Sequence, residues 1–135
     1  MARLAARLTA QAMLRNLIAG ARRHGLAVER VPKGHPLLGD AFGTYDPRIA
    51  TLAVREDLTP REALGVLAHE CCHVFLHAEV GRHPEEAAET ADELVGHLVG
   101  LHIEGALSWR LAKRLLGRPV VRAGKAVARW CLRRS

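Results

Sequence analysis

The sequence predicts a small α+β fold in which two helices pack beneath a short antiparallel sheet. The first observation is a helical spacing of apolar residues over 60–78, followed after a short connector by a second helical segment, 84–104. The second is a pair of strand-like segments, 41–45 and 49–54, joined by Asp46-Pro47, a dipeptide that favours a hairpin turn. Together these patterns predict a sheet that lies on a hairpin of helices.

The length and composition of the chain fit one domain. A chain of 135 residues with 49% apolar residues can bury one modest core. We place this core at about 26–104 and expect 105–135 to form a basic helical extension. No apolar run approaches the roughly 18 residues needed to cross a bilayer. Of the three cysteines, Cys71 and Cys72 are adjacent on a helix and cannot pair comfortably, so we predict a reducing, cytoplasmic location.

The elements before the motif region are expected in the order helix, strand, loop. A helix over 2–23 follows from leucines spaced along one side, with Gly25 just past its end. Residues 26–31 are a short strand candidate. The density of Pro and Gly over 32–43 predicts a loop. The later strand 49–54 leads into the next helix and is placed to edge a cleft, where an extended substrate could add as another strand.

The helix that follows has a clear start signal. Thr59 can cap it, Pro60 suits its first turn, and Glu62 lies three residues after Thr59 in the capping-box spacing. Pro84 can open the second helix in the same way.

The strongest functional signal is the motif His-Glu-x-x-His, formed by His69, Glu70 and His73. Residues four apart lie on one face of a helix, so His69 and His73 can direct two imidazoles at one ion. Zinc accepts nitrogen ligands and, in catalytic sites, keeps one coordination position for water. Glu70 is then placed to take a proton from that water. The motif therefore predicts a Zn²⁺ site with Glu70 as its general base.

The second helix offers candidates for a third zinc ligand. Glu85, Glu89 and Glu93 follow one another at intervals of four and so share a face. If the two helices form an antiparallel hairpin, His73 lies opposite about residue 90. Glu89 and Glu93 are then the two residues able to reach the metal, and the choice between them stays open.

Several nearby residues have secondary roles in this interpretation. His77 is expected to be structural or to support a ligand, and His97 is a weaker candidate for orienting one. Tyr45 is a candidate hydrogen-bond donor to an oxyanion. Cys71 and Cys72 are expected to be buried packing residues, because a reactive thiol needs an accessible, electropositive setting.

Residues 67–77, Leu-Ala-His-Glu-Cys-Cys-His-Val-Phe-Leu-His, resemble the motif of the ImmA/IrrE-type metallopeptidases, relatives of the thermolysin-like zincins. The preceding strand and the glutamate-rich segment 85–92 are also similar to that family, and the similarity covers about 40–104. It implies a zincin-like fold, a gluzincin-like zinc site and hydrolysis of a peptide bond, often in a regulatory protein.

The resemblance also bears on the third ligand. In that family it is an acidic residue early in the second helix, which maps onto Glu89, whereas Glu93 keeps nearly the spacing of thermolysin-like enzymes. The chain departs from the family pattern in two places. Cys71-Cys72 replaces the usual Leu-Gly, and Ala87 stands where family members often have another acid.

The net charge of +6 conceals a segregation of charge along the chain. Residues 1–28 carry five Arg and no acid, and 105–135 carry nine Lys or Arg and again no acid. All fourteen acids lie in 29–104, with six basic residues. The basic ends either bind nucleic acid or an acidic membrane surface, or they lie on the acidic middle or stay solvated.

The sequence thus predicts a zinc metallopeptidase that acts on a protein or peptide. The alternative is a non-catalytic metal-binding module whose basic terminal helices bind nucleic acid or a protein partner, through residues such as Arg118, Arg122, Lys125 and Arg129. Glu70 favours the enzyme, because a purely structural zinc site does not need a carboxylate at the position of the base.

Overall fold

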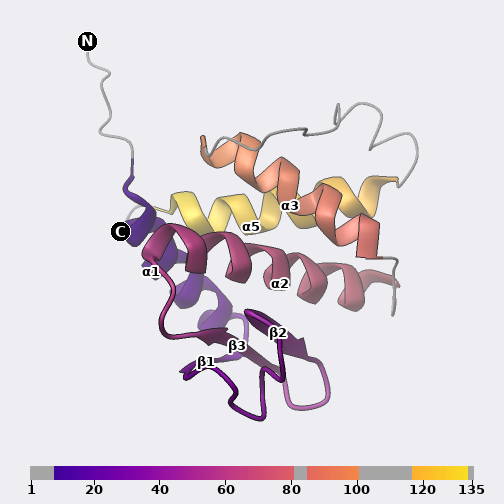
Figure 1. Ribbon diagram of the computed structural model, residues 1–135. Helices are drawn as coiled ribbons and strands as arrows, with labels where there is room; N and C mark the ends of the chain where they lie inside the picture. The colour runs from indigo at the N-terminus through magenta and orange to yellow at the C-terminus, as the bar shows by residue number, and fades with distance from the viewer. Residues whose placement is uncertain (1–7, 81–84, 101–116, 134–135) are drawn as a thin grey trace.

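A computed structural model describes residues 8–80, 85–100 and 117–133 of the chain. Its helices and strands, in chain order, are α1 (Ala10–Arg23), β1 (Ala27–Val31), β2 (Gly43–Asp46), β3 (Thr51–Arg55), α2 (Pro60–Val80), α3 (Glu85–Val99) and α5 (Arg118–Leu132). The expected α+β class is confirmed. The elements form layers, with the sheet on one side, α1 and α2 in the middle, and α3 and α5 farthest from the sheet (Figure 1).

The sheet is mixed, so the prediction of a wholly antiparallel sheet is wrong. Its strand order is β1-β3-β2, with β1 parallel to β3 and β2 antiparallel to β3. The predicted hairpin is confirmed, although Ile49 and Ala50 belong to its turn and β3 starts at Thr51. Segment 32–42 links β1 to β2 across the place that β3 occupies in the sheet. The chain then turns back after β2, and β3 lies between the two other strands. Residue alternation predicts strands but not which strands pair.

The central strand is buried on both faces. Leu52 and Val54 point into the main core under the helices, and both are 0% exposed. Ala53, on the opposite face, packs with Val31 and Leu38 in a second, smaller cluster. The expected loop over 32–42 is present, and through Leu38 it covers the outer face of the sheet.

Side-chain caps determine where two helices begin. The Ala12 amide donates to Thr9 Oγ1 at 3.1 Å, so α1 starts at Ala10. The helix expected over 2–23 is therefore wrong at Leu8 and Thr9, which precede α1, and the rest of its expected start, 2–7, lies outside the described residues. For α2 the capping box is confirmed: the Glu62 amide donates to Thr59 Oγ1 at 3.2 Å, and the Thr59 amide donates to Glu62 Oε1 at 3.0 Å.

The C-terminal helix belongs to the core. The main cluster includes Val120, Ala123, Val127 and Cys131 of α5 together with residues of α1, α2, α3 and the sheet. The expected core of 26–104 is therefore too narrow, because the apolar side of α5 packs on α1, α2 and α3. Gly124 makes this packing close, since a Cβ there would lie 3.0 Å from the Ala91 carbonyl oxygen. None of the described helices has the length and hydropathy needed to cross a bilayer.

The helix α3 is shorter than expected. It ends at Val99, where Gly100 takes a φ of 79°, a left-handed conformation that favours glycine and stops a helix. The rest of the predicted segment, 101–104, lies outside the described residues.

The place of α5 in the core gives a stability test. Val127→Ala removes two methyl groups from a side chain that is 0% exposed, and should lower the free energy of unfolding by about 1–3 kcal/mol. The control is Val121→Ala on the same helix, where the side chain is only partly buried, and it should cost less than about 1 kcal/mol. Urea denaturation measures both. Equal, small losses would mean that α5 lies outside the cooperative core.

Candidate metal centre

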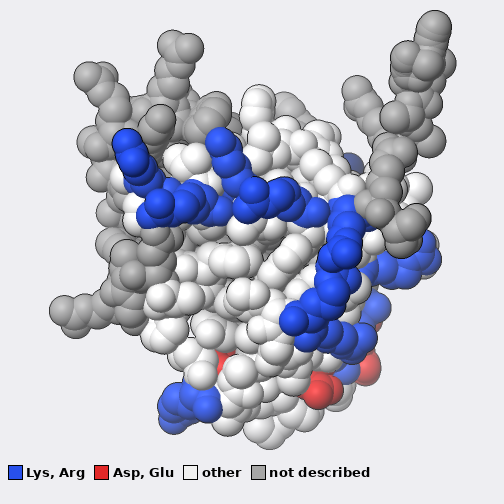
Figure 2. All heavy atoms as spheres, turned by 180° about the vertical axis from the view of Figure 1, so that it is seen from behind, with Lys and Arg blue, Asp and Glu red and all other residues white. Residues whose placement is uncertain are grey.

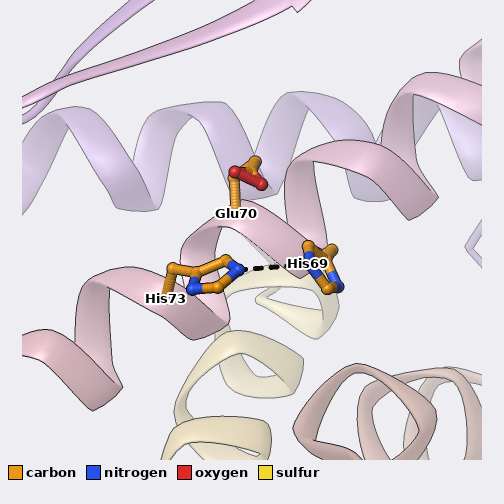
Figure 3. Close-up of side chains that lie close together, drawn as sticks. All are labelled: His69, Glu70 and His73. Atoms are coloured by element: carbon orange, nitrogen blue, oxygen red, sulfur yellow. Dashed lines mark hydrogen bonds between the residues drawn. The ribbon is translucent and has the colours of Figure 1, made fainter. Parts of the chain in front are cut away.

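The helix α2 brings the three motif residues together. His69 Nε2 and His73 Nε2 lie 3.2 Å apart, and one ligand atom from each of His69, Glu70 and His73 falls within 4.8 Å of the others. Figure 3 shows the two imidazoles one turn apart on α2, with Glu70 projecting from the neighbouring side of the same helix. The spacing of the motif thus produces the cluster that the sequence predicted.

A carboxylate from the second helix faces both imidazoles. Glu85, the first residue of α3, places Oε1 2.8 Å from His69 Nε2 and Oε2 3.2 Å from His73 Nε2. Its side chain is largely exposed, at 62%, so it reaches the histidines from the solvent side of the cleft. Two imidazole nitrogens and one carboxylate therefore converge on the same point.

A second carboxylate of α3 lies behind His69. Asp92 Oδ2 is 3.7 Å from His69 Nδ1, on the ring edge opposite Nε2. The interaction with Asp92 is the largest cause of a pKa of about 9 for His69, with Glu85 and Glu70 also raising it. A carboxylate in this position orients an imidazole and leaves Nε2 for an ion.

Glu70 lies at the junction of α2 and β2. Burial is the main cause that raises the pKa of Glu70 to about 7, and the negative charges of Glu85 and Asp92 add to it. Gly43 of β2 lies directly against this part of α2: a Cβ there would collide with the Val66 side chain and come 3.6 Å from Glu70 Cγ. The absence of a side chain at Gly43 thus lets β2 cover the carboxylate.

The cluster lies in a cleft of about 770 Å³. Its walls come from α2, the first half of α3, the start of β2 and two residues that precede β2 and α2. They are formed by Phe42, Gly43, Leu58, Arg61, Glu62, Gly65, Val66, His69, Glu70, His73, Glu85 and Asp92. A second hollow of about 230 Å³ lies on the other side of Glu70 and His73, lined also by Tyr45, Pro47 and His77. Glu70 and His73 therefore separate two hollows that follow α2.

The strand beside the cleft is β2, whereas the sequence placed 49–54 there. Gly43 of β2 lines the cleft and Tyr45 of β2 lines the second hollow, while β3 is the central strand of the sheet. The physical reason is the strand order, because β3 pairs on both sides and only β2 has an edge toward α2. This edge strand runs alongside both hollows.

The structure does not place Glu89 or Glu93 in the cleft. Glu89 is exposed and Glu93 is half-buried, and among the described residues the carboxylates that line the cleft are Glu62, Glu70, Glu85 and Asp92. Helix rotation explains this, since each residue turns the helix by about 100°. Relative to Glu85, Asp92 lies about 20° to one side, toward the core, while Glu89 and Glu93 lie about 40° and 80° to the other.

Sequence reasoning missed the roles of Glu85 and Asp92. The signal that could have found them is the run of alanines in α3: Ala88 and Ala91 are both 0% exposed and mark the side that packs on the core. Glu85 and Asp92, seven residues apart, lie at one edge of that side. The antiparallel hairpin predicts which residues of α3 lie level with His73, counted from the turn. It does not predict which face of α3 is directed toward α2.

The remaining candidates have clear positions. Cys71 and Cys72 are fully buried, and burial raises the pKa of both thiols well above its usual value, in agreement with packing residues. The rings of Tyr45 and His77 meet edge to face, with centroids 6.3 Å apart. His97 is exposed and lines neither hollow.

Comparison with known proteins finds no match to a family model, to a curated protein or to a solved structure. Its function is therefore inferred from its own residues.

Proposed function

We propose that the protein is a zinc-dependent peptidase in which His69, His73 and Glu85 hold the metal and Glu70 is the general base. The observation that carries this proposal is the 3.2 Å separation of the two Nε2 atoms, with the Glu85 carboxylate 2.8 and 3.2 Å from them. Ligand atoms about 2.0–2.1 Å from a tetrahedral zinc ion lie about 3.3 Å from one another. The donor set and its spacing therefore fit zinc.

The distances between ligand atoms also make Glu85 a better third ligand than Glu89 or Glu93. Its carboxylate is already in contact with both imidazoles, whereas Glu89 is exposed outside the cleft. This proposal departs from the resemblance to the ImmA/IrrE-type metallopeptidases, which maps the third ligand onto Glu89. Asp92 then supports His69 from behind as a positioning residue.

The chemistry that zinc supplies when bound is to acidify a water molecule and to polarise a carbonyl group. The residues of the chain do the rest. Glu70, beside the two histidines, can accept a proton from the attacking water and return it to the leaving amine. Asp92 contacts Nδ1 of His69 and leaves Nε2 toward Glu85 in the cleft, and Gly43 lets β2 pack closely against Glu70.

The shape of the site favours an extended chain as substrate. The cleft and the second hollow lie on either side of Glu70 and His73, so a substrate that fills both passes the base. The strand β2 follows the same line and lies at an edge of the sheet, where a peptide can add its own backbone hydrogen bonds. A peptide in extended conformation meets both conditions.

A non-catalytic metal module is less consistent with this geometry. A structural zinc site is usually closed by four protein ligands, and the cluster here opens into a large cleft. His77, the residue that could close it, packs against Tyr45 and lines the second hollow instead. Glu70 is half-buried beside the histidines, where a structural site has no use for it.

The ligand assignment predicts that Glu85→Gln weakens zinc binding at least about 100-fold, because it removes a charged ligand. Competition with a chromophoric chelator measures this affinity. Glu89→Gln is the matched control on the same helix and should change it less than about threefold. The opposite order, with zinc lost in Glu89→Gln and kept in Glu85→Gln, would return the ligand to the position that the family resemblance implies.

The assignment of the base predicts a separation of metal binding from catalysis. Glu70→Gln should retain zinc with nearly unchanged affinity and lower the rate of cleavage by about 10²–10⁴-fold. Cleavage of unfolded fluorescent casein by the purified, zinc-loaded chain provides the assay, with Glu89→Gln as the control. A Glu70→Gln protein that cleaves at the original rate would contradict the role of Glu70, and one that cannot bind zinc would make it a ligand.

The role of Asp92 gives a pH prediction for the metal-free protein. With Asp92 present, the pKa of His69 is about 9, so the ring stays protonated through neutral pH. Asp92→Asn removes the largest cause, and the pKa should fall toward 6.5. NMR titration of the imidazole resonances measures the pKa, and Glu89→Gln should leave it in place. An unchanged pKa in Asp92→Asn would show that Asp92 does not act on His69.

A further inference from the structure

The helix α5 carries a row of basic side chains along its exposed side. Arg118, Arg122, Lys125 and Arg129 follow at intervals of four, three and four residues, Arg133 caps the end, and all five are exposed. On the opposite side, the apolar residues of α5 are buried in the core. The charges therefore form one stripe on a helix that is held rigidly along its length.

This stripe differs from an ordinary solvated helix face. Exposed helices usually alternate acidic and basic residues at intervals of three or four, whereas α5 contains no acidic residue. Its successive basic residues repel one another, and Arg118 and Arg122 lie near the positive end of the helix dipole. A bound anion near Arg118 is favoured by the helix dipole as well as by the basic side chains.

The basic surface extends beyond α5. Helix α1 packs against α5, contains no acid, and exposes Arg15, Arg22 and Arg23. Figure 2, which shows the molecule from behind, has Lys and Arg gathered in a band across this side, while the visible acidic side chains lie in the lower part of the view. None of the α5 residues lines the cleft at the metal centre.

We propose that the exposed side of α5 binds the phosphate backbone of double-stranded DNA. Residues 118–133 span about 22 Å at 1.5 Å per residue, which is about the axial rise of six or seven base pairs of the duplex. The stripe consists mainly of arginine, whose planar guanidinium binds phosphate through two hydrogen bonds. This binding is independent of the peptidase activity.

Two other anionic partners fit less well. An amphipathic helix that lies on a membrane inserts its apolar side, but the apolar side of α5 is buried in the core. A single-stranded nucleic acid is bound largely by stacking on exposed aromatic rings. The aromatic residue of α5, Trp130, packs against Phe75 with ring centroids 4.9 Å apart, and against His24.

The test compares two variants of the full chain that lose equal charge. The stripe variant carries Arg118→Gln, Arg122→Gln and Arg129→Gln, and the control carries Arg30→Gln, Lys33→Gln and Arg48→Gln, three exposed residues of the sheet region. Fluorescence anisotropy measures binding to a labelled 20-base-pair duplex of arbitrary sequence between 50 and 200 mM salt. Thermal melts by circular dichroism verify that both variants are folded.

The unmodified chain should bind the duplex with a strong dependence on salt. The stripe variant should bind at least tenfold more weakly at 100 mM salt, and the slope of log K against log salt should fall by about three units. The control should stay within about twofold, as should Glu70→Gln, and a triple Arg→Lys variant of the stripe should retain most of the binding.

Three results would overturn the proposal. One is a chain that does not bind the duplex even at 50 mM salt, and another is an equal loss of binding in the stripe and control variants. The third is a stripe that matters only for vesicles containing phosphatidylserine, which would make a membrane surface its partner.

Discussion

The burial of α2 is the constraint on which the site depends. Leu67, Cys71 and Cys72 are all 0% exposed, and the helix packs against β2, β3, α1, α3 and α5. A helix held on so many sides cannot rotate without moving several neighbours, because protein interiors are closely packed. Its remaining polar side therefore has one orientation, and His69 and His73 owe their convergence to packing on the opposite side.

The electrostatics of the cleft favour a positive charge between the helices. Three carboxylates, from Glu70, Glu85 and Asp92, surround the imidazoles of His69 and His73. The pKa of His69 is raised to about 9 chiefly by Asp92, and the pKa of Glu70 to about 7 chiefly by burial, with Glu85 and Asp92 contributing. Because both pKa values are raised, His69 and Glu70 both hold a proton more strongly than they would in water. A bound divalent cation would neutralise the same excess of negative charge, and the carboxylates could then remain ionised.

The features that the sequence predicted correctly depend on residues close together in the chain. The capping box at Thr59, the hairpin turn after Asp46 and the shared face of His69 and His73 all follow from local spacing. Three features depend on contacts between distant segments: the parallel pairing of β1, the packing of α5 in the core, and the rotation of α3 that brings in Glu85. Local patterns contain no information on these, so Glu89 and Glu93 were plausible from spacing alone.

The arrangement of α5 explains how opposite charges coexist on so small a chain. Its apolar side packs on α1, α2 and α3, so its arginines point away from the helices that form the cleft. Packed helices lie about 8–10 Å apart, and the side chains on their outer faces lie farther still. Charges exposed to solvent and more than a Debye length apart, about 8 Å at physiological salt, are largely screened from one another. None of the described α5 residues lines the cleft, so the acidic cleft and the basic stripe are separate surfaces, and each favours a ligand of opposite charge.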